Sequence, residues 1–244
     1  MKDFHQFKED FGLNLLSQKP STKIIEWQEA GFLKRYIQPL DKCVGIKQDT
    51  KFHVDTVFEH CVKTCDNVPP ILSLRWAGLL HDIGKAQTRG RHILCGLTYP
   101  KEKKVVNYCK VKKKKCSGKC EHAIERITFY KHELASERLA KAVMRMFKVA
   151  QSTYTEAIQL IANHMYMYDC TWTDKAVGRF VRKTGITAKS LADPDNFPLF
   201  QLRIADRKSR GLEPVTPKQR DFENRLRIYF GIETGKETVC ESCK

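Results

Sequence analysis

The sequence lacks an apolar run long enough to cross a membrane. No stretch approaches the roughly 18–20 consecutive apolar residues that a helical span needs, so we expect no transmembrane helix. The first twelve residues, MKDFHQFKEDFG, lack the apolar core of a signal peptide. We therefore expect a cytosolic protein that does not enter a membrane. Its ten cysteines are then thiols or metal ligands, because disulfides are rare in the cytosol.

Acidic residues are also scarce. The 244 residues include 44 Lys and Arg but 28 Asp and Glu, which gives a formal net charge of +16. Such an excess favours nucleic acid, nucleotides or an anionic surface as partner. Half of it lies between Lys101 and Lys119, where nine lysines accompany a single acid, Glu102. This segment could attract RNA through its phosphates, with Tyr99 and Tyr108 stacking on bases, or could simply be a solvated charge cluster.

The apolar pattern is mostly that of helices, which predicts an all-α fold. Residues 52–65 show the clearest pattern, with apolar side chains recurring every three or four positions. The stretch after Pro69-Pro70 is almost wholly apolar and predicts a buried helix. The expected helices are 22–38, 52–65, 71–82, 132–147, 155–167, 198–209 and 217–229. Between 90 and 128 the helical period is lost, and residues 97–99 and 105–108 favour two short strands joined by a turn at 101–104.

His81 and Asp82 form the most informative pair in the chain. Adjacent side chains on a helix point about 100° apart, so they normally cannot serve one site. They can do so where a helix ends, and Gly84 is a typical helix stop signal. The pair also follows an apolar stretch, where an imidazole and a carboxylate are unfavourable without a compensating partner such as a metal ion.

Four further helices carry metal-type residues on or beside their apolar faces. Spacings of three, four or seven from apolar neighbours place there His60, His132, His164 and Asp206. One such residue is usually a hydrogen-bonded core side chain, but the whole set favours a metal site. Imidazoles mixed with carboxylates suit manganese, iron, cobalt, nickel or zinc, and magnesium less well. His132 and His164 complete a second site if Asp82 bridges; alternatively, a single ion is bound and one of these histidines binds phosphate.

The order of these residues resembles the HD superfamily of metal-dependent phosphohydrolases. Within it, the segments 31–60, Arg75 to Lys85, Phe129 to Ser136 and Arg203 to Gly211 resemble the HD domain of bacterial tRNA nucleotidyltransferases, the CCA-adding enzymes. Two departures are evident. Fewer than 60 residues precede His60, and they contain no glycine-serine motif followed by Asp-x-Asp, so we expect the HD part without the nucleotidyltransferase head. The second departure is a Cys- and Lys-rich insertion.

The resemblance implies roles for individual residues. It assigns metal binding to His60, His81, Asp82 and Asp206, and second-metal or phosphate binding to His132 and His164. Some relatives have a His-His pair where this chain has His164-Met165, which leaves occupancy of a second metal open. Lys85, Arg207 and Arg210 are placed to bind phosphate, unless they are ordinary surface charges. We expect His53 to contact substrate, and Asp82, Lys85, His132 and His164 to be catalytic.

The cysteines of the insertion predict a structural zinc. The proposed ligands are Cys95, Cys109, Cys116 and Cys120, although only the last two have the close spacing that zinc sites prefer. Reserve ligands are His92, His122, Cys240 and Cys243. A lysine-rich segment with little core needs such a cross-link, and free thiols in a basic loop are the alternative. The remaining cysteines, Cys43, Cys61, Cys65 and Cys170, are expected to pack as small apolar groups.

Together these features predict an HD-type helical bundle at 1–90 and 127–231, an inserted basic zinc-binding β-hairpin at 91–126, and a flexible C-terminal tail at 232–244. The expected activity is phosphoester hydrolysis with a divalent transition metal, one or two ions, on an RNA end such as the 2′,3′-cyclic or terminal phosphate of a tRNA. The first alternative is a small-nucleotide hydrolase: a 5′-nucleotidase, a deoxynucleoside triphosphate hydrolase or a cyclic-nucleotide phosphodiesterase. The second is an RNA-binding module with an idle metal site.

Overall fold

The computed structural model describes residues 3–48, 55–95, 108–109, 114–115, 123–192 and 197–232. Helices dominate these segments, which confirms the expected all-α class. The helices are α1 (Phe4–Leu15), α2 (Pro20–Glu29), α3 (Phe32–Tyr36), α4 (Gln38–Asp41), α5 (Val57–Asn67), α6 (Leu72–Leu80), α7 (Lys85–Thr88), α8 (His132–Met146), α9 (Gln151–Asn163), α10 (Asp174–Thr184), the 3₁₀ helix η1 (Lys189–Leu191), α11 (Pro198–Ser209) and α12 (Pro217–Tyr229). The strands are β1 (Arg89–Cys95), β2 (Tyr108–Cys109), β3 (Lys114–Lys115) and β4 (Ala123–Phe129).

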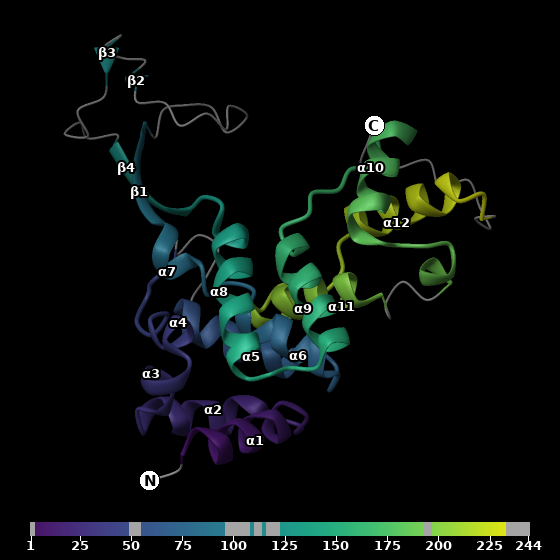
Figure 1. The fold of residues 1–244 in the computed structure, drawn as a ribbon. Coiled ribbons are helices and arrows are strands. Elements are labelled where there is room, and N and C mark those ends of the chain that lie inside the picture. The colour runs from purple at the N-terminus through teal and green to yellow at the C-terminus, as the bar shows by residue number, and fades with distance from the viewer. Residues whose placement is uncertain are drawn as a thin grey trace.

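Helix α6 lies at the centre of the fold. Every residue from Ser73 to Leu80 is buried, as the apolar stretch predicted. Helix α6 packs against α5, α9 and α11, and α8 packs against α9 (Figure 1). The helices that carry or precede the candidate ligands therefore pack around α6, directly for α5, α9 and α11 and through α9 for α8.

An aromatic cluster joins the N-terminal helix to this core. Phe7 and Phe11 of α1 are fully buried and contact Trp27 of α2, with ring centroids 5.3 and 5.5 Å apart. Phe11 also lies 5.5 Å from Trp76 of α6. The sequence analysis did not predict α1, whose core residues recur at intervals of four: Phe7, Phe11 and Leu15.

Several helices differ from the sequence-based expectation. The helix expected at 52–65 begins at Val57 and ends at Asn67. The helix expected at 22–38 is divided into α2 and α3, because Gly31 adopts a left-handed conformation with φ of 78°. A second break at Ile37 separates α3 from α4. Helix α9 begins and ends four residues earlier than the expected 155–167. Helix α10 was not predicted, although Thr173 caps it and its buried Val177 and Phe180 lie on one side.

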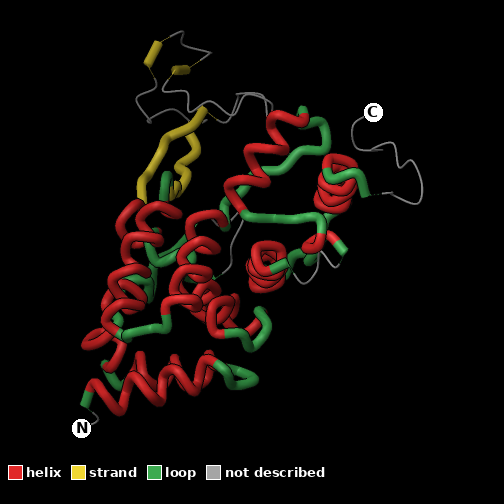
Figure 2. Tube along the Cα trace, turned by 45° about the vertical axis from the view of Figure 1, so that its right-hand side comes forward, coloured by secondary structure: helices red, strands yellow, loops and turns green. Residues whose placement is uncertain are grey.

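An antiparallel ribbon interrupts the helical order between α7 and α8. Strand β1 pairs with β4 from Arg89 opposite Phe129 to Cys95 opposite Ala123, and β2 pairs with β3. Figures 1 and 2 show β1 and β4 extending away from the helices beyond α7 and α8. The expected strand 97–99 lies outside the described residues. Of the expected strand 105–108 only Tyr108 is described, and it pairs with Lys115.

None of the helices in the described segments combines the length and the apolar character that a bilayer crossing requires.

Candidate metal centre

The turn after α6 brings His81 and Asp82 to one place. Helix α6 ends at Leu80, and both following side chains are buried, with 1% and 2% exposure. The helix ends before Gly84, the expected stop signal, but Gly84 has a φ of −68° and does not adopt the left-handed conformation common in glycines that follow a helix. Its actual role is close packing, because its N–H donates to Ser136 Oγ of α8 at 2.9 Å and a side chain there would collide with α8.

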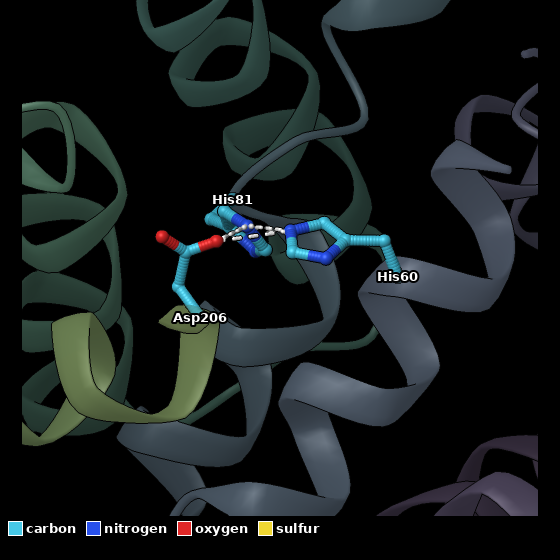
Figure 3. A group of neighbouring side chains, drawn as sticks. All are labelled: His60, His81 and Asp206. Carbon is cyan, nitrogen blue, oxygen red and sulfur yellow. Dashed lines mark hydrogen bonds and ion pairs between the residues drawn. The ribbon is translucent and has the colours of Figure 1, made fainter. Parts of the chain in front are cut away.

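One group of candidate ligands consists of His60 from α5, His81 after α6, and Asp206 from α11. The two Nε2 atoms lie 3.2 Å apart. Asp206 Oδ1 lies 3.1 Å from His60 Nε2 and 3.9 Å from His81 Nε2. Figure 3 shows the three side chains pointing toward one another from three separate helical segments.

A second group adjoins the first and consists of Asp82, His132 and His164. Asp82 Oδ1 lies 3.1 Å from His132 Nε2 and 3.5 Å from His164 Nε2. The two imidazoles face each other with their Nε2 atoms 3.3 Å apart. His132 begins α8 and His164 directly follows α9, so this group is also assembled from distant parts of the chain.

Asp82 joins the two groups. Its Oδ2 lies 3.3 Å from the Nε2 atoms of both His60 and His81, whereas its Oδ1 faces the second group. Ligand atoms bound about 2.1 Å from one ion are separated from each other by roughly 3.0–3.5 Å in octahedral or tetrahedral geometry. Most observed separations lie in or near this range, so the donor atoms fit one ion per group, with Asp82 shared.

All four imidazoles have the same orientation with respect to the centre. Each Nδ1 has an oxygen partner at 2.7–2.9 Å: Ser209 Oγ for His60, and the backbone carbonyls of Gly78, Phe129 and Ile161 for His81, His132 and His164. A proton on Nδ1 satisfies each carbonyl and leaves the Nε2 lone pair directed inward, as in metal-bound histidines. Facing lone pairs repel unless a proton or a cation lies between them.

The charges of the site are strongly coupled. Burial alone would lower the pKa of His60, but hydrogen bonds to Asp206 and Asp82 raise it above its usual value. Burial likewise opposes protonation of His132, yet its bond to Asp82 raises its pKa. Burial dominates at His164 and lowers its pKa. The pKa values of Asp82 and Asp206 are lowered despite burial, chiefly by Lys85 and His81 for the first and His60 for the second.

A cavity of about 410 Å³ opens beside both groups. Its cationic lining residues are Lys85, Arg203 and Arg210. Lys85 is buried, and its ammonium donates to Asp82 Oδ2 at 2.7 Å and Gln48 Oε1 at 2.8 Å. Arg210 binds Asp206 Oδ2 at 2.9 Å. The cavity therefore offers both carboxylates and fixed positive charge.

The structure brings some of the expected substrate-binding residues to this cavity and not others. Arg207 is not among the lining residues, and its Nε donates to the carbonyl of Glu213 at 2.6 Å. Arg203, which the sequence analysis did not select, lines the cavity instead. Its position three residues before Asp206 and seven before Arg210 is the signal that could have identified it. His53 lies outside the described residues.

The cysteines fall into two sets. Cys43, Cys61 and Cys65 are fully buried, which confirms that they pack as apolar groups, while Cys170 is partly exposed. Burial raises the pKa of the Cys43 and Cys65 thiols to about 12. The expected zinc site lies outside the described residues: Cys116 and Cys120 entirely, and Cys95 and Cys109 by their side chains. The same holds for the reserve ligands and for Tyr99.

Comparison with known proteins relates about a third of the chain to one group of proteins. No protein-family model matches the chain. It is 32% identical over 88 residues to the multifunctional CCA proteins of Aromatoleum aromaticum and Azoarcus sp., and 31% identical over 94 residues to that of Methylobacillus flagellatus. These matches cover 33–35% of this chain and 20–22% of the relatives. The chain thus contains a region similar to part of a CCA protein and spans about a fifth of the length of these relatives.

Proposed function

We propose that this protein is a metal-dependent phosphohydrolase of the HD type that acts on nucleotide or RNA-end phosphates. The observation that carries the proposal is the position of Asp82, whose two oxygens face two separate histidine groups. Buried hydrogen-bonding pairs explain single contacts of this kind. They do not explain four imidazoles that present Nε2 toward one another around a shared carboxylate.

The donor set fits divalent ions of the first transition series. His60, His81 and Asp206 would hold one ion, His132 and His164 a second, and Asp82 would bridge them. Nitrogen and oxygen donors together suit manganese, iron, cobalt, nickel or zinc, with magnesium the weaker candidate. Such ions would polarise a phosphoryl group and lower the pKa of water.

The chain's own cations would bind and orient the phosphate. An ammonium has three N–H donors, and Lys85 uses one for Asp82 and one for Gln48. The third can serve a phosphate oxygen, because Lys85 lines the cavity. Arg210 holds Asp206 in place and lines the same cavity, and Arg203 adds a further guanidinium. Buried charge of this kind neutralises an anionic transition state more strongly than exposed charge does.

A histidine of the second group can handle the proton if a single ion is bound. Hydrogen bonding to Asp82 raises the pKa of His132, which favours a proton on its Nε2. That proton could pass to the leaving oxygen of a phosphoester in the cavity. With two ions bound, His132 and His164 would instead be ligands, and Lys85 would be the remaining acid near the site.

The substrate assignment depends on charge and on the relatives. The chain carries a net charge of +16. In the sequence, its lysine-rich segment 101–119 falls between β1 and β4, and residues Ile127 to Phe129 of β4 line the cavity. The name of the relatives, multifunctional CCA protein, is consistent with action on the end of tRNA. We therefore favour an RNA end bearing a 2′,3′-cyclic or terminal phosphate.

A panel of phosphoesters tests the reaction. Purified protein is loaded in turn with manganese, nickel, cobalt, zinc or magnesium, its metal content is measured, and release of phosphate or ring opening is followed on RNA ends and mononucleotides. We expect turnover that disappears in His81→Ala and Asp206→Asn. Metal and RNA bound without turnover on any substrate would contradict the proposal and support a binding module with an idle site.

Deleting residues 97–119 separates the RNA substrate from a mononucleotide. The deletion leaves β1 and β4 joined by Gly96 and residues 120–122, a length compatible with a hairpin loop. We expect it to reduce activity on RNA ends at least about tenfold while activity on mononucleotides is retained, since nonspecific phosphate contacts supply much of the affinity for nucleic acid. Equal activity of the intact protein on RNA and on free nucleotides would favour the small-nucleotide hydrolase, for which the 410 Å³ cavity is large enough.

A further inference from the structure

The rim of the cavity carries two exposed apolar side chains that the catalytic roles above leave unused. Among the large apolar side chains that are more than a third exposed in the described residues, Tyr130 and Met165 line this cavity, with 60% and 51% exposure. Contact of apolar surface with water is unfavourable, so a ligand in the cavity that covers part of these two side chains would gain binding free energy.

The backbone ties both residues to the second ligand group. Tyr130 follows β4 and precedes His132 by two positions, while Met165 directly follows His164. The two histidine Nε2 atoms are 3.3 Å apart, so the segments that bear Tyr130 and Met165 meet at this point. Lys131, between Tyr130 and His132, has a left-handed conformation with φ of 58°, in which the chain turns from β4 into α8. The positive charges, Arg203 and Arg210, come from α11, on the side of Asp206.

We infer that Tyr130 and Met165 form a nucleobase-binding subsite of this cavity. An aromatic ring stacks on the face of any base, and a polarisable thioether packs well against an aromatic ring. A base held there would lie beside the His132–His164 group, and the phosphate of the same nucleotide would extend toward Lys85, Arg203 and Arg210. A sugar phosphate without a base offers nothing that covers the two apolar side chains.

This inference rests on the proposed function for the role of the cavity, but its test measures binding rather than turnover. The probes are the nonhydrolysable methylenephosphonate analogues of AMP, CMP and ribose 5-phosphate, titrated calorimetrically into metal-loaded protein. The variants are Tyr130→Ala, Tyr130→Phe and Met165→Ala. Leu134→Ala and Met167→Ala are matched controls, because both side chains are exposed, lie two to four residues away and do not line this cavity.

We expect Tyr130→Ala to weaken binding of both nucleotide analogues about tenfold, in line with the loss of one stacking contact, and to leave ribose phosphonate binding unchanged. Tyr130→Phe should retain wild-type binding, and Met165→Ala should have a smaller effect in the same direction. An equal loss on all three probes, or no loss in Tyr130→Ala, would overturn the inference. If the protein hydrolyses phosphoesters but binds the probes equally with and without a base, the subsite is contradicted and the phosphohydrolase proposal stands. If binding depends on the base but no phosphoester is turned over, the subsite stands and the phosphohydrolase proposal is contradicted.

Discussion

At the residue scale, the candidate centre depends on side chains that bind no ion themselves. Ser209 accepts the Nδ1 proton of His60 at 2.9 Å and donates to the backbone carbonyl of Asp206 at 2.7 Å. It therefore fixes the ring of one candidate ligand and the backbone of another. Replacing a hydrogen-bond partner of a metal-ligating histidine commonly lowers metal affinity about 10–100-fold.

Ser209→Ala should lower metal affinity at the His60–His81–Asp206 group by about 10–100-fold, since the imidazole loses the acceptor that fixes its tautomer and orientation. Competition with a chelator of known affinity measures the change. Ser73→Ala is the control, because Ser73 is also buried but its hydroxyl has no hydrogen-bond partner among the described residues. Unchanged affinity in Ser209→Ala would show that Ser209 does not position His60.

The pH dependence of stability should differ between metal-free and metal-loaded protein. The raised pKa values of His60 and His132 stabilise the metal-free fold below their unfolded value of about 6.5, and this stabilisation is lost as pH rises through the folded values. Metal binding requires unprotonated Nε2 atoms and therefore strengthens over the same range. We expect the difference in melting temperature between the two forms to widen between about pH 6 and pH 8.

A thermal-denaturation series with and without chelator measures this difference. Asp206→Asn removes one of the carboxylates that raise the pKa of His60, so the pH dependence of the metal-free form should become shallower in this variant. A melting-temperature difference that stays constant or narrows with rising pH would contradict the assignment of these histidines as ligands.

At the element scale, the turn between α6 and α7 packs closely against α8 beside the site. A Cβ on Gly84 would lie 2.5 Å from the backbone nitrogen of Ser136, and nearer still to the carbonyl oxygen of His132. Both neighbours are backbone atoms of α8 that cannot rotate away.

Gly84→Ala should therefore destabilise the fold by about 1–3 kcal/mol and weaken metal binding, because α8 must shift and carry His132 with it. Differential scanning calorimetry and metal titration measure the two effects. Gly12→Ala is the matched control, since an added Cβ there meets nothing within 4 Å. If Gly84→Ala and wild type have equal melting temperatures, α8 accommodates the added Cβ without a loss of stability and the prediction is wrong.

Local sequence signals predicted some elements well and others poorly. Helices α11 and α12 begin where expected, because Pro198 and Pro217 occupy their first turns and favour helix starts. The buried helix after Pro70 was also predicted, since a nearly continuous apolar stretch has few other uses. The β1–β4 ribbon was not predicted, because its pairing joins residues 28 to 40 positions apart, from Cys95 with Ala123 to Arg89 with Phe129, and no local period records that contact.

At the scale of the whole molecule, the candidate ligands were selected from separate helices without knowledge of how those helices pack. The pattern of polar groups on apolar faces was sufficient to choose His60, His132 and His164, because such groups are rarely buried without partners. The sequence offered their division into two groups around Asp82 as one alternative, but it could not show which oxygen of Asp82 faces which group, since that depends on how the helices pack. Arg207 was chosen because it is basic and adjacent to Asp206, whereas Arg203 was missed although its spacing of three from Asp206 favours the same side of the helix.

The positive charge of the chain is concentrated in one segment, residues 101–119, and this segment is expected to attract RNA. Nine lysines lie between Lys101 and Lys119, whereas the cationic groups of the cavity are buried or half-buried. Lysines that neutralise phosphates release counterions, so affinity for RNA should fall steeply with salt. Replacing Lys112, Lys113, Lys114 and Lys115 with Gln should weaken RNA binding and reduce the slope of log affinity against log salt by up to about 3, at roughly 0.7 per phosphate contact on a single strand.

Fluorescence anisotropy of a labelled RNA across a salt series measures this slope. The control replaces Lys34, Lys42, Lys175 and Lys183 with Gln, which removes the same charge from exposed positions outside the insertion. If both quadruple variants change the slope equally, the attraction arises from the overall charge of +16 and the insertion has no special role. If only the first variant does so, the insertion is the part of the molecule that engages RNA, and its ribbon connects that contact to the cavity.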